Sequence, residues 1–159
     1  MFEHLIAEHD ELRAILDRMP ALLENGVERN EASIRQCRWE MSRLLFQHLA
    51  REEREVYTPL DQVDDPALQR LANVFRSDLK AIHEAFQAHM KKWSTLSIAG
   101  QWDRYRSDVV TLNNRLIHRF DREERLLFPR IKPEHIKSIG AVRYNWARDV
   151  WSFRDQIMS

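Results

Sequence analysis

The chain has 159 residues, a length that suits one domain with an ordinary hydrophobic core. Hydrophobic residues make up 43% of it and the formal net charge is zero, which argues against a disordered chain and against a nucleic-acid-binding surface. A single cysteine excludes an internal disulfide and a zinc site made of several thiolates. Neither an apolar run of membrane-spanning length nor a signal-peptide pattern is present, so we expect a soluble, cytoplasmic protein with no membrane partner.

Glycine and proline are scarce, which favours long helices. Apolar residues recur in steps of three and four, and they predict helices over residues 2–23, 31–57, 66–96 and 101–128. Before the third helix, Asp65 is a predicted cap and Pro66 a predicted first helical residue. Four long helices with short connections predict an all-α fold, an antiparallel up-down four-helix bundle over residues 1–131.

The C-terminal extension, residues 132–159, contains a fifth predicted helix over 141–157. One face of this helix is apolar and carries Val142, Trp146, Val150, Phe153 and Ile157. We expect it to pack on the outside of the bundle, with a protein partner or self-association through this face as the alternative.

Three predicted helices each direct one histidine into the core. His9 and His83 lie on the apolar faces of the first and third helices, and His48 lies on that of the second with Glu52 one turn later. A single such histidine is commonly a core residue with a hydrogen-bond partner, but buried charges must be paired or coordinate a metal. Histidines together with a carboxylate are a ligand set for iron, manganese or zinc.

The fourth helix repeats a phrase of the second, because HLAREEREVYTP at 48–59 resembles HRFDREERLLFP at 118–129. Glu123 continues the apolar face of this helix, whereas His118 lies almost opposite on an ideal helix. Either His118 is a surface residue, or a π-bulge rotates it toward Glu123. The repeated phrase favours the bulge, since π-bulges concentrate at functional sites.

These motifs together resemble the hemerythrin-like family, the HHE cation-binding domain, over roughly residues 2–131. The resemblance rests on AEHDELRAIL with His9, HLAREE with His48 and Glu52, AIHEAF with His83, and HRFDREERLLFP with His118 and Glu123. It implies that the four histidines and two glutamates hold two iron ions in a non-heme di-iron centre. The two carboxylates would bridge the ions, and open positions would bind a small diatomic molecule or peroxide.

One position departs from the oxygen-carrying hemerythrins, which have a second histidine four residues after the first on the third helix. Gln87 stands there, and His89 lies two residues further and off the face. The chain therefore resembles the members with four histidines and two carboxylates, which implies binding or sensing of O2, NO or reactive oxygen species. The alternatives are a di-iron peroxidase or oxidase, an iron-homeostasis or iron-centre repair protein, and a metal-free helical interaction module.

Overall fold

The computed structural model describes residues 1–24 and 27–136 together with Arg154 and Ile157, and it leaves out the side chains of residues 27–29. Every regular element of this described part is helical, which confirms the predicted all-α class. The predicted helix over 141–157 lies outside the described residues, except for Arg154 and the buried Ile157. Across the described part, no helix combines the length and the apolar character needed to cross a membrane.

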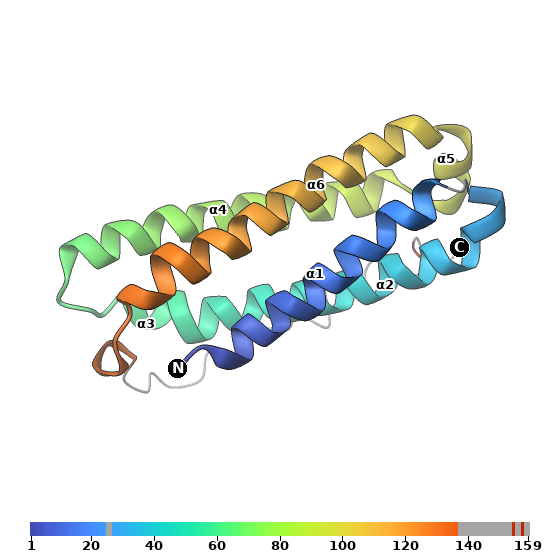
Figure 1. Cartoon of the computed structure of the whole chain (residues 1–159). Coiled ribbons are helices and arrows are strands. Elements are labelled where there is room, and N and C mark those ends of the chain that lie inside the picture. The colour runs from blue at the N-terminus through green and yellow to red at the C-terminus, as the bar shows by residue number, and fades with distance from the viewer. Residues whose placement is uncertain (25–26, 137–153, 155–156, 158–159) are drawn as a thin grey trace.

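Four long helices lie side by side, and consecutive ones point in opposite directions (Figure 1). They are α1 (Glu3–Glu24), α2 (Val27–Glu52), α4 (Pro66–Lys92) and α6 (Trp102–Arg122). Helices α1 and α4 each contact both α2 and α6. The apolar faces of the four helices therefore enclose a common hydrophobic core.

The buried face of α1 explains how a histidine enters this core. Its buried residues follow one another in helical steps, as Leu5, His9, Leu12, Leu16, Met19 and Leu23. Because side chains three and four residues apart share a face, His9 takes a place that an apolar residue would otherwise fill.

Helix α2 spans Val27–Glu52 with a kink at Asn30, and its continuous part follows this kink, near the predicted start at residue 31. The backbone leaves helical geometry at Asn30, with φ −127° and ψ 16°, and the Asn30 side chain donates to the carbonyl of Leu22 at 3.3 Å. After Glu52 the helix widens into the π-helical turn η1 (Glu53–Tyr57) and closes with α3 (Thr58–Leu60). The helical path through residue 57 therefore agrees with the sequence prediction.

Helix α4 confirms its predicted start and corrects its predicted end. The Asp65 side chain accepts a hydrogen bond from the Leu68 backbone N–H at 3.0 Å, and Pro66 is the first helical residue. The prediction that the helix continues to residue 96 was wrong, because Trp93 is extended and fully buried. The separate helix α5 (Thr95–Gly100) then begins with Ser94 as its cap.

Helix α6 also ends in a wide turn, so both copies of the repeated phrase have the same local geometry. The π-helical turn η2 (Glu123–Leu127) follows α6 directly, and the 3-10 turns η3 (Phe128–Arg130) and η4 (Pro133–His135) come after it. A bulge is present, but it does not lie between His118 and Glu123, where the sequence prediction placed it. It begins at Glu123, so the backbone from His118 to Arg122 remains α-helical.

Candidate metal centre

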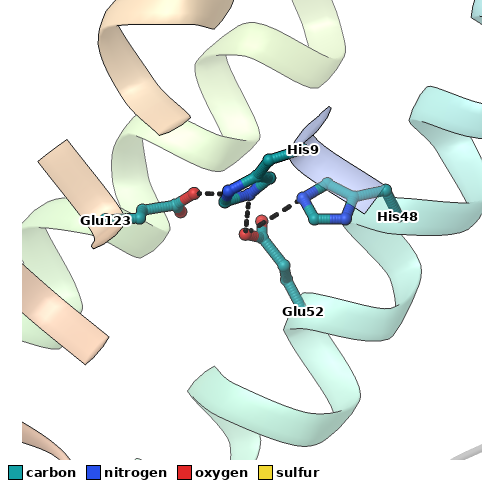
Figure 2. Close-up of side chains that lie close together, drawn as sticks. All are labelled: His9, His48, Glu52 and Glu123. Atoms are coloured by element: carbon teal, nitrogen blue, oxygen red, sulfur yellow. Dashed lines mark ion pairs between the residues drawn. The ribbon is translucent and has the colours of Figure 1, made fainter. Parts of the chain in front are cut away.

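Four side chains from three helical segments converge inside the bundle, as Figure 2 shows. His9 comes from α1, His48 and Glu52 come from α2, and Glu123 is the first residue of η2. Each is at most 1% exposed, and the four potential ligand atoms lie within 4.8 Å of one another. Such convergence of two imidazoles and two carboxylates is the donor arrangement of a cation site.

These groups face one another at ion-pair distances, but none of the pairs has hydrogen-bond geometry. Glu52 Oε1 lies 3.2 Å from His48 Nε2 and 3.6 Å from His9 Nε2, and Glu123 Oε2 lies 3.4 Å from His9 Nε2. None of these four inward atoms has a hydrogen-bond partner among the described residues. A buried polar atom without a partner destabilises the fold, so a cation bound by all four would remove that penalty.

Two further glutamates orient the imidazole rings. The Nδ1 atom of His9 lies 2.8 Å from Glu124 Oε1, and the Nδ1 atom of His48 lies 2.8 Å from Glu8 Oε2. A carboxylate only accepts, so each ring donates from Nδ1. In the neutral ring this leaves the lone pair of Nε2 directed into the cluster, as metal-binding histidines require.

Arginines hold these two orienting glutamates in place. Arg13 donates to Glu124 Oε1 at 2.9 Å, and Arg51 forms an ion pair with Glu8. Each inward imidazole is thus the end of a chain from arginine to glutamate to histidine. These chains connect α1 with η2 and α1 with α2, so the same contacts fix the rings and the helices that carry them.

Aromatic rings form the apolar wall of the cluster. Phe120 stacks on His9 with ring centroids 4.3 Å apart and meets the ring of His48 edge-on at 5.8 Å. Phe128 is the second ring stacked on His9, at 6.0 Å. These rings place an apolar surface beside the buried inward atoms, and such a surface limits the access of water to a metal site.

Without a cation, protons are shared among the same groups. Burial lowers the pKa of His9, but its contacts with Glu123 and Glu52 outweigh burial and raise that pKa to about 9. Burial raises the pKa of Glu52, yet the charges of His48 and Arg119 hold it well below its usual range. Burial and the neighbouring Glu52 raise the pKa of Glu123. A bound cation must therefore displace a proton from this cluster.

A family model, the hemerythrin HHE cation binding domain, matches residues 1–131 of the chain. The chain belongs to this family. No curated protein and no solved structure gives a match. The match covers all four long helices, and the buried His/Glu cluster supports a metal-binding protein.

The structure does not bring the other two predicted ligands of this HHE domain into the cluster. His118 is exposed on α6, because the wide turn begins only at Glu123 and leaves the helix before it unrotated. His83 lies on α4 in a separate pocket of about 470 Å³, where its ring meets Phe46 edge-on at 5.1 Å. His89 is buried elsewhere on α4 and stacks on Tyr105, and Gln87 is half-buried.

The HHE cluster also contains two residues that the sequence prediction missed. Arg119 is 1% exposed and pairs with both Glu52 and Glu123, and the Tyr57 hydroxyl donates to Glu123 Oε1 at 2.8 Å. A signal for Arg119 was present, since it follows Leu116 by three residues and precedes Glu123 by four. Tyr57 carried no comparable signal, because it lies at the end of an apolar face where an aromatic residue is ordinary.

Proposed function

We propose that this hemerythrin HHE domain is a non-heme iron protein that binds or senses O2, NO or a reactive oxygen species. The observation that carries the proposal is the set of four buried, mutually facing atoms: His9 Nε2, His48 Nε2, Glu52 Oε1 and Glu123 Oε2. Two nitrogens and two oxygens suit iron, with manganese and zinc as the other candidates.

The surrounding protein supports a site for a small ligand. Four protein donors would leave coordination positions open on an ion that prefers six ligands, and the Phe120 and Phe128 rings would give these positions an apolar surrounding. Glu8 and Glu124 hold the two imidazoles in the orientation that such a site requires. In this proposal the site lies inside an antiparallel up-down bundle formed by the four long helices. The cytoplasmic location of the protein stays a prediction.

The test compares the wild-type chain with Glu52→Gln and Glu53→Gln. Glu53 is adjacent in sequence but forms a partly exposed ion pair with Arg76, so it is a matched control outside the cluster. After anaerobic loading with Fe(II) and removal of excess metal, we expect iron in the wild type and in Glu53→Gln and little in Glu52→Gln. Addition of NO or O2 should then change the optical spectrum of the two loaded proteins. Equal iron contents in all three, or no iron in any, would contradict the proposal.

A di-iron-type peroxidase or oxidase activity is the second candidate, and Tyr57 favours it. The Tyr57 hydroxyl is buried, donates to Glu123 and accepts a hydrogen bond from Arg119 at 2.8 Å. A phenol in this position holds a proton next to the proposed ligand site. Peroxide turnover by the iron-loaded wild type that falls in Tyr57→Phe, with iron content unchanged, would support an enzyme. Absence of turnover in the loaded wild type would leave binding or sensing as the function.

A further inference from the structure

The resemblance to hemerythrins predicts two iron ions bridged by Glu52 and Glu123, but each carboxylate already has a protein partner on one side. Glu52 directs Oε1 toward the histidines and has Oε2 3.4 Å from Arg119 Nη2. Glu123 directs Oε2 toward His9, while its Oε1 pairs with the same Arg119 nitrogen. Each of the two glutamates therefore faces the inward histidine nitrogens with one oxygen and the Arg119 guanidinium with the other.

Arg119 is fixed in this position by the rest of the protein. Its Nη1 donates to the Phe75 carbonyl at 2.9 Å and to Asp78 Oδ2 at 3.2 Å, and its Nη2 donates to the Tyr57 hydroxyl at 2.8 Å. Because these contacts come from α4 and from η1, the guanidinium is held from directions other than the two glutamates. Moving it aside would leave a buried charge without its partners.

Charge gives an independent reason against two cations. With neutral imidazoles, Glu52, Glu123, Arg119 and its partner Asp78 carry a net formal charge of minus two. A divalent ion beside the histidines would change this to zero. A second divalent ion on the side of the guanidinium would change it to plus two, in an interior where unpaired charge is strongly unfavourable.

Ligand supply points the same way. The two predicted ligands that would complete a second ion, His83 and His118, lie in a separate pocket and on the exposed face of α6. Among the described residues, His9, His48, Glu52 and Glu123 form the one group of histidine, cysteine and acidic side chains whose ligand atoms converge on a single point.

We infer that the centre holds a single cation, and that the Arg119 guanidinium occupies the place of the second. The guanidinium supplies the positive charge that keeps the two carboxylates together, so the second ion is unnecessary. This inference rests on the proposed metal-binding function and specifies how many ions the site takes. Arg119 acts here as a positioning residue for Glu52 and Glu123.

The first test counts ions in the full chain. The chain is loaded with excess Mn(II), desalted, and measured by elemental analysis and electron paramagnetic resonance. We expect one manganese per chain with the spectrum of an isolated ion. Two ions per chain, or the spectrum of an exchange-coupled pair, would overturn the inference while supporting metal binding. A chain without bound manganese or iron would overturn both.

The second test removes the guanidinium. Arg119→Gln keeps much of the side-chain volume but removes the charge, Arg119→Lys keeps the charge, and Arg115→Gln is a control on the exposed side of α6. Circular dichroism establishes that each variant is helical. We expect Arg119→Gln to take up more than one manganese per chain, whereas Arg119→Lys and Arg115→Gln stay at one. A count of one in Arg119→Gln would show that the guanidinium does not replace an ion.

Discussion

His9 faces Glu52 and Glu123 on the cluster side of its ring and Glu124 on the outer side, and His48 lies in the same way between Glu52 and Glu8. Substitution of the outer carboxylates, Glu124 and Glu8, should destabilise the fold less than substitution of Glu52 or Glu123, because they are partly exposed and do not face the cluster. Their predicted role is to hold the rings so that both Nε2 atoms face the ion.

We predict that Glu8→Gln and Glu124→Gln each weaken metal affinity by roughly 10- to 100-fold, without abolishing binding. An amide accepts a weaker hydrogen bond than a carboxylate, so each ring loses both alignment and basicity. Competition with a fluorescent chelator measures the affinity. The control is Glu11→Gln, an exposed residue of α1. Affinities equal to that of Glu11→Gln would show that the outer carboxylates do not orient the rings.

The six predicted ligands can be separated by alanine variants. From the geometry, His9→Ala, His48→Ala, Glu52→Ala and Glu123→Ala should lose the metal, because each removes one of four converging donors. The structure places His83 and His118 outside the cluster, so His83→Ala and His118→Ala should retain it, as should the exposed control His4→Ala. The metal content of each variant after loading decides between a site of these four ligands and a site of all six predicted ligands. Loss of metal from His83→Ala or His118→Ala would restore the ligand set that the family resemblance implies.

The sequence alone predicted the part of the site that depends on helical phase. His9, His48, Glu52 and Glu123 all continue an apolar face, and a helix places such residues inward. The orientation of His118 was harder to predict. A π-bulge rotates only the residues that follow its start, so a bulge that begins at Glu123 does not change the direction of His118. The role of Glu8 and Glu124 as hydrogen-bond partners of the histidines could not be predicted from the sequence. A charged residue next to a ligand is usually solvated, and only the packing of neighbouring helices brings one of them against an imidazole ring.

At the scale of helices, His89 forms a buried link between α4, α2 and α6. Its ring stacks on Tyr105 of α6 at 5.7 Å, and the charged groups acting on it are Arg38, Asp108 and Lys92. Burial, followed by the charge of Arg38, lowers the pKa of His89 to about 4 from its ordinary 6.5. The folded protein therefore resists protonation of this ring, whereas the unfolded chain does not.

This gives a pH prediction with a defined sign. Stability from neutral His89 is present above pH 6.5 and is lost as the pH falls toward 4, because the unfolded chain gains the proton first. The loss amounts to about 3 kcal/mol. In His89→Phe the free energy of unfolding should fall less steeply over this window than in the wild type or in His118→Phe, as urea denaturation at several pH values would show. Parallel curves for all three proteins would contradict the assignment.

Helix boundaries were predictable where a local signal exists and not where tertiary packing decides. Asp65 and Pro66 mark the start of α4 by their own chemistry. The end of α4 is decided by Trp93, which leaves the helix to bury its ring and to donate from Nε1 to Asp108 at 2.9 Å. The sequence predicted a bulge in the fourth helix but not its starting residue, and it did not predict the matching turn after Glu52. Similarity between two segments does not indicate the residue at which a bulge begins.

For the whole molecule, a bound cation should act as a fold-stabilising ligand. At free metal about 100 times the dissociation constant, the folded state gains about 2.7 kcal/mol, so the midpoint of thermal unfolding should rise by several degrees. The Glu52→Gln variant should show no such rise, because a donor of the site is lost. Differential scanning calorimetry with and without manganese measures the shift, and equal shifts in both proteins would place the metal elsewhere.

Several whole-chain expectations stay predictions. The division into a bundle over residues 1–131 and an extension over 132–159 is one of them, as is an outer helix or partner-binding face in that extension. The absence of a nucleic-acid partner is another.

Anomalous X-ray diffraction at the iron edge, from crystals of the iron-loaded chain, tests metal binding at the buried cluster most directly. We predict one anomalous peak within bonding distance of His9 Nε2, His48 Nε2, Glu52 Oε1 and Glu123 Oε2, with Arg119 still between the two glutamates. Absence of a peak at this place, or a peak at His83 or His118 instead, would contradict the account.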